Sequence, residues 1–249
     1  YHLGLTHVYR FNAHDNKQAE QHFERAIALD PNFASAHSAM SFAKFQNVFL
    51  RLRPDRAAAI EEARRYAEQA LMLDAQDPQS NFAMGRVHWL DGSLDDAMPW
   101  LETALAIDPN YSRAFYTRGN INLLRLQTES TITDFDQAHS LSPLDPLSAA
   151  MLASRGVAEV QRGNFETAIR TAERAALTPR AHYVGMYPAV ISNAIAGNIE
   201  KARYWREFIL ERRPDAKLKD FVRAMPFQDE GFRRDIEDAL RSAGMPDID

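Results

Sequence analysis

The chain has 249 residues and a formal net charge of −5, because 34 Asp and Glu outnumber 29 Lys and Arg. A net-acidic chain lacks the basic surface that nucleic acids and anionic membranes attract, so we expect neither as its main partner. Hydrophobic residues at 45% and charged residues at 25% are an ordinary globular balance, which argues against wholesale disorder. The absence of cysteine excludes disulfides, thiolate metal sites and a cysteine nucleophile.

The chain begins at Tyr1 rather than at a methionine, and its first residues already show a helical pattern. No apolar run approaches the roughly 18 residues that a membrane-spanning helix needs, and no signal-peptide pattern opens the chain. We therefore expect a cytoplasmic fragment of a longer protein, without membrane association.

A repeated sequence unit runs through the chain. The segment Ala26–Phe33 recurs almost unchanged as Ala104–Tyr111, and both contain an Asp-Pro-Asn step. Ala104 lies 34 residues after Ala70 and 34 residues before Ala138. A fixed period of this length predicts stacked supersecondary units that bury a continuous core together.

The residue types at the repeated positions suit two closely packed antiparallel helices. Small residues such as Gly85 and Ala97 allow the helices to approach, Leu101 fills the space beside them, and the next copy has Gly119 at the position of Gly85. Pro109 ends a second helix because proline cannot continue it. Glycines at the ends of first helices predict left-handed caps, at Gly92, Gly163 and Gly197.

The predicted elements follow in chain order as six helix pairs and a cap. The first pair has a longer turn at residues 12–16, and the second pair is 44 residues long, with its extra residues around 48–57. The fourth departs from the pattern at Leu126, where a turn glycine is expected, and at Thr131, where alanine is expected. Alternating β-branched runs are scarce, so we predict an all-α, right-handed α–α superhelix. The pairs occupy residues of about 1–33, 34–77, 78–111, 112–145, 149–182 and 183–217, and capping helices and a tail occupy 218–249.

The period and its pattern, clearest in residues 78–111 and 112–145, resemble the tetratricopeptide repeat (TPR). Three further stretches make the chain similar to the C-terminal TPR region of bacterial multidomain regulators, namely 52–55, 141–146 and the tail from 224 to 247. In those regulators a class III adenylate cyclase domain or a winged-helix DNA-binding domain precedes the repeats. The resemblance implies a non-catalytic module that binds a protein segment and regulates an N-terminal output domain.

The resemblance also implies which side chains face a concave groove, namely those on the inner faces of the first helices. In the second and sixth pairs these include Phe42, Phe45 and Tyr187. Aromatic anchors beside a few polar groups are typical of peptide grooves, while the alternative is that the groove is filled by packing or by the C-terminal helix. The chaperone-type carboxylate clamp is not implied, because its groove lysine is missing from the corresponding positions of this chain. The candidate peptide-binding residues are Phe82, Arg86, Trp89, Arg113, Tyr116 and Asn120.

The chain shows no phosphate-binding loop, dinucleotide fingerprint or hydrolase motif, and its eight histidines lack the spacing of helical metal ligands. We therefore expect no enzyme activity, no cofactor and no metal. Two other interpretations stay open. One is a self-association element, a homodimer through apolar residues such as Phe221, Phe227 and Phe232. The other is an enzyme whose groups converge from different repeats.

Overall fold

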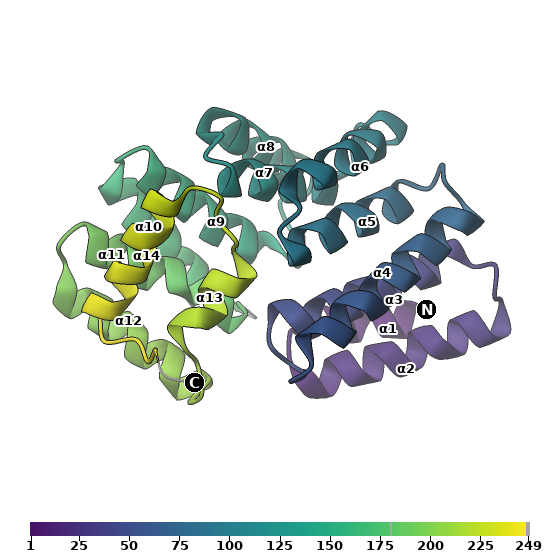
Figure 1. The fold of residues 1–249 in the computed structure, drawn as a ribbon, viewed down its shortest axis with the longest axis horizontal. Helices are drawn as coiled ribbons and strands as arrows, with labels where there is room; N and C mark the ends of the chain where they lie inside the picture. The colour runs from purple at the N-terminus through teal and green to yellow at the C-terminus, as the bar shows by residue number, and fades with distance from the viewer. Residues whose placement is uncertain (180, 248–249) are drawn as a thin grey trace. The chain divides into compact units, whose positions relative to one another are not determined.

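The computed structural model describes residues 1–179 and 181–247, and the described residues form helices and turns without a strand (Figure 1). This confirms the predicted all-α class. The chain divides into two compact units, Tyr1–Arg118 and Gly119–Asp249, and the division falls inside α7 (Ser112–Leu124). No helix of the described residues is both long and apolar enough to cross a membrane.

The first unit is a stack of antiparallel helices in chain order. Each of its helices packs against the next through α6, and α3 also packs against α5, so the first helices of neighbouring pairs are in direct contact (Figure 1). Its helices are α1 (His2–Val8), α2 (Ala13–Leu29), α3 (Ala34–Phe49), α4 (Arg56–Leu73), α5 (Pro78–Asp91), α6 (Leu94–Ile107) and the first half of α7.

The second unit continues the same alternation and adds two C-terminal helices. There α9 packs against α10 and α11, and α14 packs against α11 and α13. Figure 1 shows α14, in yellow, lying beside α11. The described helices are α8 (Thr128–Leu141), α9 (Ser148–Gln161), α10 (Phe165–Leu177), a 3₁₀ turn (Tyr183–Met186), α11 (Tyr187–Ile195), α12 (Ile199–Arg212), α13 (Leu218–Ala224) and α14 (Glu230–Ser242).

The predicted close crossings are confirmed at the repeat glycines. A Cβ atom added to Gly85 would lie 2.8 Å from side-chain atoms of Leu101, and one added to Gly119 would lie 2.7 Å from the ring of Phe135. These separations are too short for real carbon atoms, so only glycine lets each helix pair approach so closely. Small residues therefore set the spacing of the pairs.

The turns follow the predicted chemistry, with two differences. Gly92 adopts a left-handed conformation with φ of 81°, as predicted, and Leu126 adopts φ of 56° although it has a side chain. Leu126 thus takes the turn conformation that the missing glycine would have supplied. The longer turn predicted at residues 12–16 is wrong, because α2 already begins at Ala13 and the side chain of Asn12 caps it by accepting from the Asp15 N–H.

Candidate functional site

A small cavity of about 110 Å³ lies within the first unit. Its walls come from α1, α3, α5 and the segment that enters α7. Ser38, Phe42 and Phe45 recur at helical spacing along α3, and Phe82 and Arg86 stand one turn apart on α5, so each helix presents one face to the cavity.

The cavity has a buried floor and a partly exposed rim. Phe42, Phe45, Phe82 and Arg86 are buried and form the floor. The rim consists of half-buried residues, namely Tyr1, Tyr9, Gln79, Tyr111 and Arg113. The cavity therefore opens to the surface of the first unit between them.

Arg86 is the unusual residue of the floor, because it is a cation surrounded by aromatic rings. Its guanidinium carbon lies 4.1 Å from the ring centroids of Phe42 and Phe45 and 5.1 Å from that of Phe82. Only 6% of the residue is exposed, and its buried Nε has no hydrogen-bond partner among the described residues. Burial lowers the pKa of Arg86 to about 10, so the group still carries its charge at neutral pH.

The electrostatic neighbours of Arg86 are phenols and a second guanidinium. After burial, the largest influences on its pKa are Tyr116, Tyr9 and Tyr111, which raise it, and Arg113, which lowers it. Arg113 lies over the ring of Tyr9, 4.8 Å from its centroid. Burial also raises the pKa of Tyr111, so this phenol is neutral at physiological pH and keeps a proton that it can donate.

The six candidate residues do not all meet at this cavity. Phe82, Arg86 and Arg113 line it, and Tyr116 is buried close enough to influence the pKa of Arg86. Trp89 is 2% exposed, and its ring packs edge-on against Phe45 and Phe49 at centroid distances of 5.8 and 5.7 Å.

Asn120 lies in the second unit, is fully buried, and accepts a hydrogen bond of 2.7 Å from Ser154 Oγ. The structure therefore places Trp89 and Asn120 in packing and hydrogen-bonded positions. Sequence reasoning did not identify Tyr1, Tyr9 and Tyr111 as part of the cavity, although Tyr111 stands at the end of the repeated segment Ala104–Tyr111.

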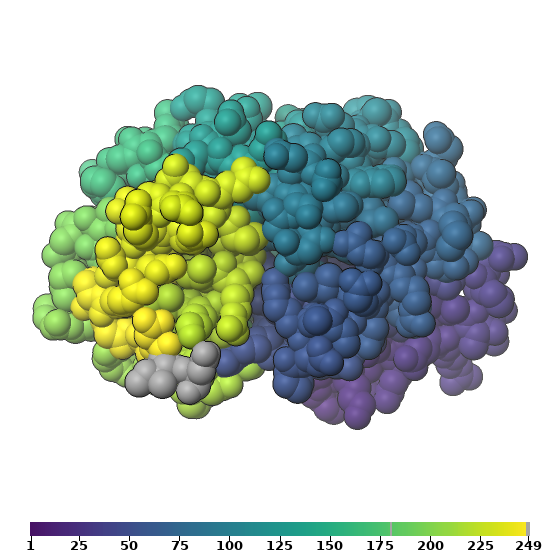
Figure 2. All heavy atoms as spheres, viewed as in Figure 1, coloured from purple at the N-terminus to yellow at the C-terminus, as the bar shows by residue number. Residues whose placement is uncertain are grey.

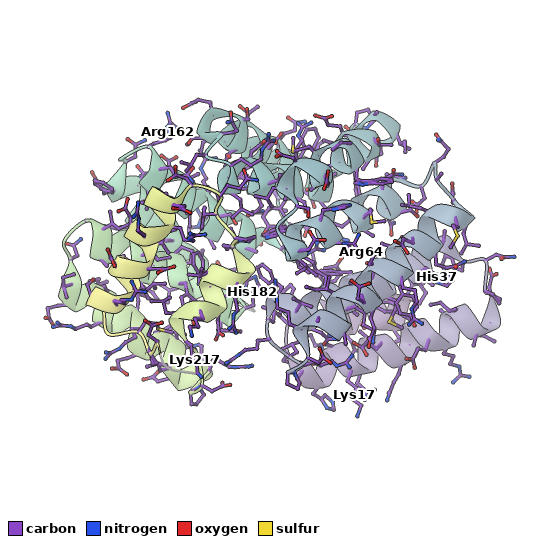
Figure 3. The ribbon with its side chains drawn as sticks, in the orientation of Figure 1. Lys17, His37, Arg64, Arg162, His182 and Lys217 are labelled. Carbon is purple, nitrogen blue, oxygen red and sulfur yellow. The ribbon has the colours of Figure 1, made fainter. Side chains whose placement is uncertain are left out.

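In the second unit the C-terminal helices cover the position that corresponds to Phe82. Tyr187 is fully buried, stacks on Phe221 of α13 at 5.5 Å, and donates a hydrogen bond of 2.7 Å to the Lys217 carbonyl oxygen. Figure 2 shows the C-terminal residues, in yellow, gathered on the surface of this unit, and Figure 3 labels Lys217 where α13 begins. The alternative of a groove filled by the chain's own C-terminal helices therefore applies here.

The aromatic residues suggested for homodimer formation are mostly inaccessible. Phe221 and Phe227 are buried, and Phe227 packs edge-on against Phe232 at 5.2 Å. They form the core between α13, α14 and the adjoining turn, so Phe221 and Phe227 as a self-association surface were a wrong expectation.

Comparison with known proteins identifies the repeat. Residues 53–112 match the model of the tetratricopeptide repeat. A segment of 134 residues, 50% of this chain, is 26% identical to the "DnaJ homolog subfamily C member 7 homolog" of Dictyostelium discoideum. The match covers 24% of that relative, so the chain spans about a quarter of its length.

Solved structures share the fold at low sequence identity. The Cut9 and Hcn1 hetero-tetramer of the APC/C matches with a TM-score of 0.64 and 13% identity over 89% of this chain and 42% of the other. PilF of Pseudomonas aeruginosa matches with a TM-score of 0.56 and 15% identity, over 88% of this chain and 92% of PilF. PilW, a type IV pilus biogenesis factor, matches with a TM-score of 0.57 and 18% identity, over 81% of this chain and 92% of PilW. The chain thus shares its helical-repeat fold with these solved structures.

Proposed function

We propose that this chain is a non-catalytic, cytoplasmic module whose first unit binds a segment of a partner protein at the cavity around Arg86. One observation carries the proposal. A buried guanidinium without a hydrogen-bond partner on its Nε stands at the bottom of an aromatic cavity that opens between half-buried side chains. Fixed polar groups among aromatic anchors are the usual composition of a binding hot spot.

The proposal includes regulation. Because the tail and inserted stretches resemble the TPR regions of bacterial multidomain regulators, partner binding in the first unit would change the output of a domain N-terminal to the repeats. The nature of the helical repeat supports this role, since each repeat adds one strip of contact surface. The C-terminal helices that cover Tyr187 leave the first unit as the better place for a partner.

A peptide-selection experiment tests the binding site. The chain is immobilised, peptides are selected from a random display library, and the affinity of the selected peptides is measured for wild type, Tyr9→Ala and Arg113→Ala. Both residues lie at the rim, so their loss should leave the helices folded, which circular dichroism checks. We expect each variant to weaken binding by about tenfold or more.

The matched control is Tyr204→Ala, which removes an exposed aromatic ring from the second unit. Binding by this variant should equal that of wild type. Selected peptides that bind Tyr9→Ala and Arg113→Ala as tightly as wild type, or that lose affinity for Tyr204→Ala instead, would place the site elsewhere and overturn the proposal.

A further inference from the structure

Two buried cations of the first unit differ in how their charge is balanced. Lys44 lies 2.9 Å from a carboxylate oxygen of Glu20 and 2.9 Å from one of Glu62. Burial lowers the pKa of Lys44, but these two carboxylates outweigh burial and raise it. Lys44 is therefore a structural cation whose charge is satisfied within the unit.

Arg86 has the opposite balance. Its pKa is lowered, and the leading influences on it are burial, three phenols and another cation rather than a carboxylate. The rings of Phe42 and Phe45 attract the guanidinium face, but rings offer no acceptor to the N–H groups at its edge. Buried charges in proteins are normally paired. Arg86 lines the cavity and its Nε has no hydrogen-bond partner among the described residues, which indicates that the acceptor comes from a ligand.

We infer that the cavity around Arg86 binds one carboxylate, the side chain of an Asp or Glu within the partner segment. The inference rests on the proposed function and names the chemistry recognised at that site. Arg113 adds a second positive charge at the rim, and neutral Tyr111 supplies a hydroxyl donor near it.

The size of the cavity selects this occupant. A volume of about 110 Å³ is smaller than the roughly 150 Å³ cavity that takes a benzene ring, so a carboxylate on a methylene stem fits better than an aromatic side chain. The rings of Phe42, Phe45 and Phe82 would pack along that stem. A chain-terminal carboxylate is less suitable, because its α-carbon also carries a side chain and a peptide group.

The test titrates the whole chain with sodium acetate, a carboxylate on a methyl group, at constant ionic strength set with chloride. Thermal unfolding is followed by circular dichroism. We expect a saturable rise in the melting temperature of wild type, by about 5 °C when the acetate concentration is about one hundred times the Kd for acetate. Arg86→Met should abolish the rise, Arg113→Gln should raise the apparent Kd severalfold, and Arg86→Lys, which keeps the charge without the planar fork, should raise it about tenfold.

Arg65→Met is the matched control, because Arg65 also lies over an aromatic ring, 5.0 Å from the Tyr66 centroid, but is exposed and away from the cavity. It should respond to acetate as wild type does. Inorganic phosphate at the same ionic strength should give no saturable rise, and a rise with phosphate larger than with acetate would overturn the assignment to a carboxylate.

The selected peptides distinguish a side-chain carboxylate from a chain-terminal one. They also test the carboxylate inference separately from the proposed binding site. An amidated peptide that keeps its internal Glu or Asp should bind like its free-acid form, while the Gln or Asn version should bind about tenfold or more weakly. Binding lost on amidation instead would assign the site to a chain end. If acetate has no effect and Gln versions bind equally, while Tyr9→Ala still weakens binding, the carboxylate inference fails and the proposed function survives.

Discussion

Replacing Arg86 by methionine should make the protein more stable, which is the opposite of the usual effect of changing a buried residue. Methionine keeps the approximate length and flexibility of the arginine stem but carries no charge and only a weak acceptor. The prediction follows from the uncompensated burial of the guanidinium, since removing a charge that costs free energy releases that cost.

The magnitude comes from the pKa of Arg86, which falls from 12.5 to about 10. Each pKa unit corresponds to about 1.4 kcal/mol, so keeping the buried group charged costs roughly 3 kcal/mol at neutral pH. Attraction to the rings of Phe42, Phe45 and Phe82 returns about 2 kcal/mol. We therefore expect Arg86→Met to raise the free energy of unfolding by about 1 kcal/mol. For a base whose folded pKa is lowered, the cost is fully present below pH 10 and is relieved only as the pH rises above it, so the gain should be constant from pH 6 to pH 9.

Urea denaturation followed by circular dichroism measures the change, and Lys44→Met supplies the contrast. Loss of Lys44 leaves Glu20 and Glu62 without their shared cation, so this variant should lose about 2 kcal/mol. Because the ion pairs hold the pKa of Glu62 below 4.5 in the folded protein despite its partial burial, their contribution is present above pH 4.5 and is lost as the pH falls through the lowered pKa. The Lys44→Met protein should therefore lose less stability than wild type as the pH falls below 4.5. An Arg86→Met protein that is destabilised by more than about 1 kcal/mol would show that Arg86 is a structural residue, and the reasoning would be refuted.

Three further predictions concern packing, pH dependence and the C-terminal helices. Gly85→Ala should lower the free energy of unfolding by about 1–3 kcal/mol in urea denaturation, because the new methyl group would lie 2.8 Å from Leu101, and an unchanged midpoint would contradict the close crossing. Burial lowers the pKa of His182, labelled in Figure 3, to about 4, and its neutral Nδ1 accepts a hydrogen bond from the Gly185 N–H. Wild type should therefore lose stability as the pH falls from about 6.5 to 4. His182→Gln should flatten that part of the stability profile, which thermal unfolding at each pH measures. Tyr187→Phe should cost about 1 kcal/mol by removing the donor to the carbonyl oxygen where α13 begins, and hydrogen exchange should show faster opening of α13, whereas unchanged exchange would mean that this bond does not hold the helix in place.

Much of the fold could be predicted from the sequence because its determinants are local. Alanines and glycines that recur with a period of 34 residues identify the helix pairs. Gly85 and Gly119 are glycines because each meets a large side chain of the second helix of its pair. The turn at Leu126 shows the limit of this reasoning, since a leucine adopts a backbone conformation that composition alone assigns to glycine. The Leu126 N–H donates to the Leu123 carbonyl oxygen and the Gln127 N–H to that of Asn122, so the turn keeps the hydrogen bonds of a left-handed helix end without a glycine.

The candidate site depended on tertiary structure to a greater degree. Helical spacing put Phe82, Arg86 and Trp89 on one helix, but it did not show that Trp89 packs against Phe45 and Phe49 while Arg86 stands at a cavity. Nor could helical spacing show that Tyr9, which lies near the start of the chain and far from Arg86 in the sequence, lines the same cavity.

By itself, the sequence determined the helical repeat, its period and the small residues that let helices cross closely. Only the tertiary structure decided which buried charge is balanced and which is not. Lys44 and Arg86 look alike in the sequence, as single cations within apolar helical segments. Their difference arises because α2 and α4 bring Glu20 and Glu62 to Lys44, whereas α1, α3 and α7 bring rings and a second cation to Arg86. Charge compensation is a property of neighbours in space, and those neighbours are set by packing between helices that are distant in the chain.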